Sequence, residues 1–509
     1  MIRTSSRSGM WPGLGTRAPA ATGRCAALLA TMGLALGLGG AGCASMDPDV
    51  LGEPPGACAA PDQTTACMSA GVHTTADTSS LDTLTPGGNL LGHLAAGGRD
   101  EYAFTANQGE GVFLRLVDVA GGPLVPTFTI SGPSGTTVTS ATGTTVASVS
   151  FAASATGTYT IAVRDASSAQ VAGDYRLYFT RAPGANAGGA LTPGGVLAAH
   201  LDEGALDSYT FTANQGESVF LRVVDVDNAA MTPAFTIYNP AGGVVVNALG
   251  ASVASSSFAA PVTGSYTVVV YDWSTGFTGT GDYKLYFSRA PGANAGGLLA
   301  PGSVTLGHLD EGEIDSYTFT ANQGEGVFLR LVDVAGGPLV PAFTVYGPSG
   351  AVVTATSSAN VVNASFAAGA TGTYTLVVYD VSSGLSATGD YRLYFTRAPG
   401  ANAGGALTPG GAAFGHLDEG ALDSYTFTAI AGDRVALRMT DLAAGPLVPA
   451  FTVYRPTGAV VVNALGSDVA TTSFTVPVTG VYTVVAYDWS TGFTDTGDYE
   501  LDFTRTPGP

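Results

Sequence analysis

The sequence predicts an all-β protein made of four tandem antiparallel β-sandwich domains, and three observations predict it. The segment Leu-Thr-Pro-Gly-Gly, or a close variant, begins at Leu84, Leu191, Leu299 and Leu407, so the chain repeats itself every 107 or 108 residues. Charged residues make up only 11% of the chain, whereas 71 of its 509 residues are glycine. Short runs of alternating polar and apolar residues are separated by turn residues, which is typical of sandwiches and barrels.

The length of the repeat distinguishes domains from solenoid units. Solenoid repeats run to about 20–50 residues, whereas about 100 residues can close a core of their own. We therefore expect a signal peptide, a tether and four β-sandwich repeats, which cover residues 1–42, 43–83, 84–190, 191–298, 299–406 and 407–509.

The first segment has the features of an export signal. Four arginines and no acid precede an apolar stretch at residues 26–38, which is too short and too rich in glycine for a membrane-spanning helix. Small residues then lead to Cys43, as at the acylated cysteine of a bacterial lipoprotein, although Gly40 stands where leucine is usual. We expect a lipoprotein of the cell envelope or outer surface, or a secreted protein if ordinary cleavage leaves Cys43 unacylated.

Two further cysteines, Cys58 and Cys67, lie close together after the signal. Close pairs in exported chains commonly form disulfides, so we expect a local one here. The four repeats contain no cysteine, so each must be held together by packing alone.

The third copy illustrates the strands expected in every repeat. Val327, Leu329 and Leu331 alternate with Arg330, so the three apolar side chains face one side of a strand and the arginine the other. Similar runs separated by glycine and proline turns predict strands at residues 315–320, 327–334, 343–346, 351–354, 372–379 and 390–395.

The joints between repeats are nearly identical. Arg-Ala-Pro-Gly-Ala-Asn-Ala-Gly-Gly begins at Arg181, Arg289 and Arg397. Such short joints offer no large side chain to fasten one repeat onto the next, so we expect limited contact between domains and some bending.

Net charge bears on the choice of partners. The formal charge is −20 with no block of acids, so the chain repels phosphate backbones and anionic membrane surfaces. We expect no nucleic-acid partner, and membrane attachment only through a lipid anchor at Cys43.

An aromatic loop is the best candidate for binding. Tyr-Asp-Trp-Ser-Thr-Gly-Phe occurs in the second and fourth copies, which places Trp273 with Phe277 and Trp489 with Phe493 where a turn leaves a strand. Exposed aromatic rings bind sugars or partner side chains, but the same rings could instead cap the end of their own sandwich. The third and first copies have Val381 and Ala166 in place of the tryptophan.

Acidic residues cluster early in three of the copies, as Asp202, Glu203 and Asp207, as Asp310, Glu311 and Asp315, and as Asp418, Glu419 and Asp423. Loop carboxylates at such spacing can bind calcium, although ordinary solvated acids are the alternative. The first copy has Ala95 and Ala96 in place of the leading pair.

One histidine occupies the same position in each copy: His93, His200, His308 and His416. We expect a hydrogen-bonded imidazole at a strand end, with a metal ligand as the alternative. The chain lacks the zinc-protease motif, the Gly-x-Ser-x-Gly turn and the phosphate-binding glycine loop, so we expect no catalytic residues and no cofactor other than calcium.

Over residues 84–509 the sequence resembles the bacterial pre-peptidase C-terminal domain family. The fourth copy carries the resemblance most fully, in residues 422–429, 431–435, 477–485 and 497–501. The resemblance implies a jelly-roll β-sandwich of the kind found behind secreted peptidases. Collagen-binding relatives build a calcium site partly from an acidic linker, whereas the joint at residues 289–309 has no acid, so neither property carries over.

We therefore expect an exported surface protein without enzymatic activity, which acts as a spacer or adhesive array. Its partners would be polysaccharide, extracellular matrix or another surface protein. One alternative is a dedicated carbohydrate- or matrix-protein-binding array, and another is an accessory to a secreted peptidase.

Overall fold

The computed structural model describes residues 81–119, 121–184, 187–227, 231–292, 295–334, 336–400 and 403–509, which belong to one compact unit. The predicted signal peptide, the lipidation site Cys43 and the pair Cys58 and Cys67 lie outside the described residues. Within the described ranges, no helix has the length and apolar character needed to cross a bilayer.

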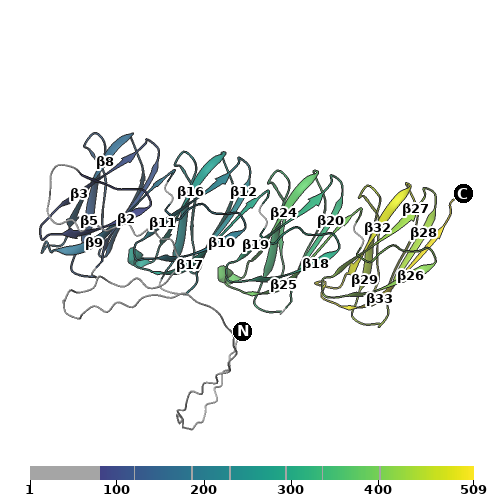
Figure 1. The fold of residues 1–509 in the computed structure, drawn as a ribbon. Coiled ribbons are helices and arrows are strands. Elements are labelled where there is room, and N and C mark those ends of the chain that lie inside the picture. The colour runs from purple at the N-terminus through teal and green to yellow at the C-terminus, as the bar shows by residue number, and fades with distance from the viewer. Residues whose placement is uncertain are drawn as a thin grey trace, which may run out of the picture. The chain divides into compact units, whose positions relative to one another are not determined.

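Four modules follow one another, and each contains eight main strands in two sheets (Figure 1). Sheet I joins the first, eighth, third and sixth main strands of a module in that spatial order, and sheet II joins the second, seventh, fourth and fifth. This order is the jelly-roll arrangement of two face-to-face Greek keys. The predicted fold class is therefore confirmed.

Modules 1 and 2 have the following strands. In module 1, sheet I contains β2 (Gly88–Leu94), β9 (Gly173–Ala182), β4 (Gly111–Asp118) and β7 (Val146–Ala152), and sheet II contains β1 (Asp82–Thr83), β3 (Asp100–Ala106), β8 (Gly157–Asp165), β5 (Pro126–Ser131) and β6 (Thr137–Thr142). In module 2, sheet I contains β10 (Gly195–Leu201), β17 (Gly281–Ala290), β12 (Ser218–Asp225) and β15 (Val253–Ala259), and sheet II contains β11 (Leu206–Ala213), β16 (Gly264–Asp272), β13 (Pro233–Tyr238) and β14 (Val244–Leu249).

Modules 3 and 4 repeat the pattern. In module 3, sheet I contains β18 (Ser303–Leu309), β25 (Gly389–Ala398), β20 (Gly326–Asp333) and β23 (Val361–Ala367), and sheet II contains β19 (Ile314–Ala321), β24 (Gly372–Asp380), β21 (Pro341–Tyr346) and β22 (Val352–Ser357). In module 4, sheet I contains β26 (Gly411–Leu417), β33 (Gly497–Thr506), β28 (Arg434–Asp441) and β31 (Val469–Thr475), and sheet II contains β27 (Leu422–Ala429), β32 (Gly480–Asp488), β29 (Pro449–Tyr454) and β30 (Val460–Leu465). Short 3-10 turns, η1 (Thr275–Phe277) and η2 (Ser383–Leu385), follow β16 and β24.

Each module has an interior between its two sheets, built from the alternating apolar residues of the strands. In module 3, Phe319 stacks on Tyr374 with ring centroids 5.2 Å apart, and both rings are buried with Leu329 and Leu393. The Tyr374 hydroxyl donates a 2.7 Å hydrogen bond to the carbonyl of Ala370, which ties the strand to the preceding turn. The predicted alternation of buried and outward residues places Arg330 on the outer face of sheet I.

The outer face of sheet I is covered by the following module. One apolar cluster contains Phe328 and Val332 of module 3 together with Tyr454 and Val485 of module 4, so sheet I of module 3 packs against sheet II of module 4. Corresponding clusters join module 1 to module 2 and module 2 to module 3. The expectation of limited contact between domains is therefore wrong, because the outer faces carry large apolar side chains.

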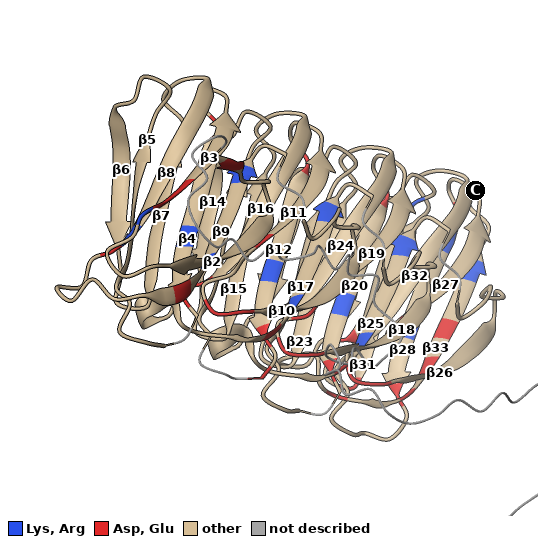
Figure 2. Cartoon of the chain, turned by 60° about the vertical axis from the view of Figure 1, so that its left-hand side comes forward, with Lys and Arg blue, Asp and Glu red and all other residues tan. Residues whose placement is uncertain are grey.

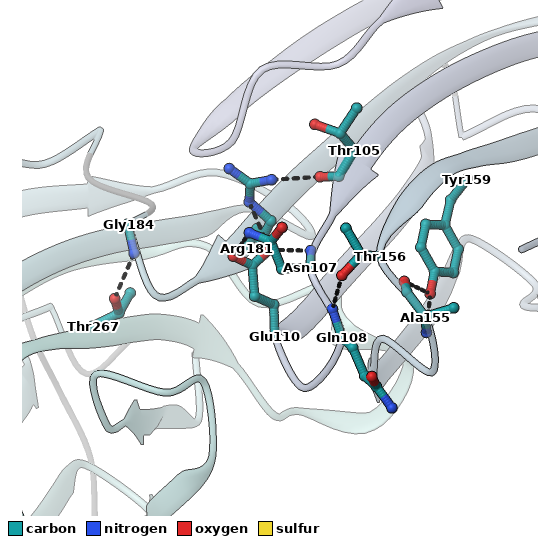
Figure 3. A network of polar contacts seen from close by, with 10 residues as sticks. All are labelled: Thr105, Asn107, Gln108, Glu110, Ala155, Thr156, Tyr159, Arg181, Gly184 and Thr267. Carbon is teal, nitrogen blue, oxygen red and sulfur yellow. Dashed lines mark hydrogen bonds and ion pairs between the residues drawn. The ribbon is translucent and has the colours of Figure 1, made fainter. Parts of the chain in front are cut away.

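The glycine-rich joints are also fastened. Gly184 and Gly400 donate backbone hydrogen bonds of 3.4 and 3.3 Å to the hydroxyls of Thr267 and Thr483 in the following module, and Gly292 donates one of 3.1 Å to Thr375. Figure 3 shows the first of these joints. The backbone itself supplies the attachment that the small side chains do not.

The arginine that begins the joint is held to its own module. Arg181 donates to the carbonyl of Thr105 at 2.5 Å, and its Nε lies 3.4 Å from a carboxylate oxygen of Glu110 (Figure 3). Glu110 in turn accepts hydrogen bonds from the backbone and side-chain amides of Asn107, at 2.9 and 2.7 Å. Each joint therefore leaves its module from a fixed point.

Candidate functional site

The arginine on the outer face of the third main strand is the principal polar group at each junction between modules. Arg115, Arg222 and Arg330 are 0%, 2% and 2% exposed, although they point away from their own cores. Figure 2 shows basic positions recurring from module to module along the sheets. A fully buried arginine is rare unless its donors are paired, so its partners matter.

The following module supplies a carbonyl and two aromatic rings, and the arginine's own module supplies an amide oxygen. Nη2 of Arg330 donates to the backbone carbonyl of Asp488 at 3.1 Å, and its Nε donates to Oδ1 of Asn363 at 3.2 Å. The guanidinium carbon lies 5.3 Å from the ring centroid of Tyr487 and 4.4 Å from that of Phe493. Aromatic faces attract cations most strongly where water is excluded, so these rings hold the arginine of one module on the next.

Burial lowers the pKa of Arg330 to about 10, and nearby Asp488 acts in the opposite direction. The pKa values of Arg115 and Arg222 are likewise lowered to about 10 by burial. All three side chains therefore stay charged at neutral pH. Each junction contains a buried cation that is bonded to carbonyls and rings.

The predicted aromatic loop divides its rings between two roles. Phe277 of module 2 lies over the guanidinium of Arg115 of module 1, with the carbon 4.6 Å from its ring centroid, and Phe493 covers Arg330 in the same way. Trp273 and Trp489 instead remain 48% exposed. The phenylalanines cap a neighbour's arginine, whereas the tryptophans face outward, and ligand binding by the four rings stays a prediction.

An aspartate at the end of the strand holds this loop in shape. Oδ1 of Asp272 accepts backbone hydrogen bonds from Thr232 at 2.8 Å and Ser274 at 2.9 Å, and Oδ2 accepts one from Gly279 at 2.9 Å. Phe277 has φ of 59°, which bulky residues rarely adopt. This backbone conformation turns the phenylalanine ring back toward the preceding module.

The leading acids of the predicted calcium clusters are paired across junctions. Asp202 of module 2 lies 3.4 Å from Nη1 of Arg176 of module 1, and Asp310 of module 3 lies 3.1 Å from Nζ of Lys284 of module 2. The third such pair joins Asp418 and Arg392, at 3.9 Å. Figure 2 shows acidic positions gathered along one edge of the modules.

The last acids of the clusters have a different role. The Tyr283 hydroxyl donates to Asp207 at 2.7 Å, and Tyr391 and Tyr499 donate to Asp315 and Asp423 at 2.6 Å. Burial raises the pKa of Asp207 to about 6. Burial also raises the pKa values of Asp315 and Asp423.

Glu203, Glu311 and Glu419 lie between these two positions and are partly buried. Across the described ranges, no three or more His, Cys, Asp or Glu side chains are grouped so that they could hold a metal ion. The members of each predicted calcium cluster therefore have separate surroundings, and calcium binding stays a prediction.

The repeated histidine is hydrogen-bonded at a strand end. Nδ1 of His308 lies 2.6 Å from Oδ1 of Asp390, directly opposite on the neighbouring strand, and half of the imidazole is exposed. The hydrogen bond to Asp390 raises the pKa of His308, as Asp282 raises that of His200. His93 and His416 make the same bond with Asp174 and Asp498.

A cavity of about 310 Å³ lies at the junction of modules 3 and 4. Its walls include Arg330 and Asn363 of module 3, and Asn463, Tyr487 and Trp489 of module 4. Sequence reasoning identified only the tryptophan. The missed signal is that Phe328 and Val332 place two large apolar side chains on the outer face of β20, on either side of Arg330, which is typical of a strand covered on both sides.

Comparisons with known proteins give a similarity to solved structures but no sequence match. A scan of protein-family models finds no match, and neither does a search of curated proteins. Among solved structures, the chain is similar to the pre-peptidase C-terminal domain of a collagenase from Bacillus anthracis, at 20% sequence identity and a TM-score of 0.18. The match covers 20% of this chain and 93% of that domain. The chain is thus similar to a pre-peptidase C-terminal domain over about the length of a single module.

Proposed function

We propose that the protein is an exported, non-enzymatic surface protein whose modules form a spacer that carries adhesive sites. The observation that carries this proposal is the buried arginine at each junction, which joins each module to the next through hydrogen bonds and aromatic rings. Modules joined in this way can hold binding surfaces at fixed separations, and several weak sites on one chain gain avidity.

The tryptophans favour binding to a partner over a purely mechanical role. Trp273 and Trp489 are each 48% exposed on modules 2 and 4, although tryptophan is usually well covered. An aromatic ring with a polar edge contributes much of the energy at protein and ligand interfaces. A carbohydrate- or matrix-binding array is therefore the second candidate function.

Location and adhesion can be tested together in the producing cells. We expect the wild-type chain to be accessible to protease added to intact cells, and the Cys43→Ala variant to be released into the medium with reduced cell adhesion. Retention of the wild-type chain in the cytoplasm, or adhesion unchanged by deletion of the protein, would contradict the proposal.

A further inference from the structure

The cavity between modules 3 and 4 has the size and the lining of a binding site. Its volume of about 310 Å³ lies at the lower end of the range for small-ligand pockets. Sheet I of module 3 supplies one wall and sheet II of module 4 the other. The site therefore exists only where two modules meet, and neither module contains it alone.

Arg330, which lines this cavity, carries a donor without a partner among the described residues. The side chain is 2% exposed, and its Nε and Nη2 donate to Asn363 and to the carbonyl of Asp488. Its Nη1 is buried and has no hydrogen-bond partner among the described residues. An unpaired buried donor costs about 1–3 kcal/mol, so an acceptor that reaches Nη1 from the cavity would recover this free energy.

Trp489 supplies a half-exposed aromatic surface to the same cavity. Its ring centroid lies 6.0 Å from that of Tyr487 and 5.7 Å from that of Phe493, so two fixed rings orient it. Asn363 and Asn463 add amide groups, which both donate and accept hydrogen bonds. The lining therefore combines one flat apolar face with several polar groups of both kinds.

This combination suits a sugar ring, which has apolar C–H faces and a rim of hydroxyl groups. A purely apolar ligand would leave the Arg330 donor unpaired, and the chain's charge of −20 opposes a polyanion. We propose that the groove between modules 3 and 4 binds a segment of an uncharged polysaccharide. Trp489 stacks on a sugar ring, while Arg330 and Asn363 hydrogen-bond its hydroxyl groups.

The junction of modules 2 and 3 provides an internal comparison. There, Nη1 of Arg222 has acceptors, the carbonyls of Gly312 and Glu313 at 3.4 and 3.5 Å. Val381 replaces the tryptophan, and Leu385 replaces the phenylalanine. With its donor occupied and no exposed tryptophan, this junction lacks the features that the proposal requires.

The junction of modules 1 and 2 shares the unpaired donor and the exposed tryptophan. Nη1 of Arg115 is buried without a partner among the described residues, and Trp273 matches Trp489 in exposure. Two of the three junctions therefore carry an unpaired donor beside an exposed tryptophan.

The test measures binding of the purified full chain to neutral oligosaccharides, namely hexamers of glucose and of N-acetylglucosamine, by titration calorimetry. Hexagalacturonate serves as the acidic probe. The variants are Trp489→Val, which installs the residue of module 3, Arg330→Lys, and the control Val381→Ala. Trp273→Val is introduced into every chain, including the reference chain, so that only the junction of modules 3 and 4 is measured.

We expect at least one neutral hexamer to bind the reference chain, and Trp489→Val to weaken its affinity at least tenfold without lowering the melting temperature. Arg330→Lys should also weaken binding, because lysine loses the planar donors. Val381→Ala should have no effect. Absence of binding to every neutral probe, binding of the acidic probe alone, or binding indifferent to Trp489→Val would overturn the inference.

This inference rests on the adhesive role proposed above but can fail separately from it. If no neutral sugar binds while the chain still lies on the cell surface and mediates adhesion, the groove assignment is wrong and the surface role stands. If the chain is retained in the cytoplasm, the surface role falls whatever the calorimetry shows.

Discussion

The third main strands of modules 3 and 4 have related sequences in different surroundings. In β20 every residue is buried, whereas in β28 buried residues alternate with exposed or partly exposed ones. Arg330 lies beneath the aromatic rings of module 4, whereas the equivalent Arg438 is half-exposed and lies 3.7 Å from Asp502. The same side chain forms a buried junction in one module and a surface ion pair in the other.

The neighbouring residues account for the difference. Phe328 and Val332 flank the buried arginine, whereas Ala436 and Thr440 flank the exposed one. On sheet II, module 1 likewise has Ser131 at the position of the tyrosine at the end of β13, β21 and β29. The polar or small residues lie on the two faces that no other described module covers, as at the ends of repeat proteins.

The largest effect is expected from Phe328→Ala. This side chain is buried between modules with Tyr454, at 5.4 Å between ring centroids, so its loss leaves a cavity at the junction. We expect the free energy of unfolding to fall by about 3 kcal/mol, measured by denaturant titration followed by circular dichroism. The control Arg434→Ala, on the exposed face of β28, should change it by less than about 0.5 kcal/mol. Equal effects of the two variants would show that the junction is not packed.

A close approach between modules makes Gly312→Ala the second largest effect. A Cβ at this position would lie 2.4 Å from Cγ2 of Val224 in the preceding module, and φ is +65°. The equivalent Gly97 of module 1 has φ of +67° but nothing nearer than 3.2 Å. We expect the free energy of unfolding to fall by about 2–3 kcal/mol for Gly312→Ala and by about 1 kcal/mol for Gly97→Ala, measured from denaturant titrations of both chains. Similar losses for the two variants would mean that the positive φ, and not the close approach to Val224, causes the destabilisation.

Replacing each arginine with alanine compares the buried environment of Arg330 with the exposed environment of Arg438. Arg330→Ala removes two hydrogen bonds and two cation–π contacts, which is offset in part by relief of a buried charge. We expect a loss of about 2 kcal/mol in denaturant titrations, against less than about 0.5 kcal/mol for Arg438→Ala. An equally large loss for Arg438→Ala would contradict the claim that, of these two arginines, only Arg330 is buried at a junction.

The last prediction concerns the pH dependence of stability. Burial raises the pKa of Asp207 from 3.8 to about 6, so between these values the folded chain holds a proton that the unfolded chain releases. Stability should therefore fall as pH rises through this window and level off above it. The wild type should lose about 2 kcal/mol relative to Asp207→Asn between pH 4 and pH 7, measured from melting curves of both chains. If the stability of both chains changed equally with pH, the raised pKa of Asp207 would be contradicted.

The sandwich itself could be predicted from the sequence, because strands with one buried face show an alternation of apolar and polar residues. Phe319 and Tyr374 were expected to be strand residues and lie in the core. The junctions were missed because their partners lie more than 150 residues apart, as with Arg330 and Asp488. Alternation tells which side of a strand Arg330 occupies, but not what covers that side.

The candidate site was predicted only in part, for the same reason. Trp489 stands out in the sequence as an aromatic residue in a polar loop, whereas Asn363 and Arg330 enter the site from the preceding module. The acids Asp202 and Asp310 were read as one local cluster with their neighbours, but each is paired with a basic residue of another module. Contacts between copies cannot be derived from the pattern within one copy.

The central claim is that the outer sheet faces are covered by neighbouring modules, and cysteine labelling tests it most directly. Ala450 on the outer face of β29 is 1% exposed beneath module 3, whereas the equivalent Thr127 on β5 is partly exposed. In separate full-length chains carrying Ala450→Cys or Thr127→Cys, maleimide labelling is followed by peptide mass spectrometry. Stacked modules predict that the cysteine at 127 reacts many times faster than the one at 450. Equal, fast reaction at both positions would mean that the modules come apart in solution and would contradict the account.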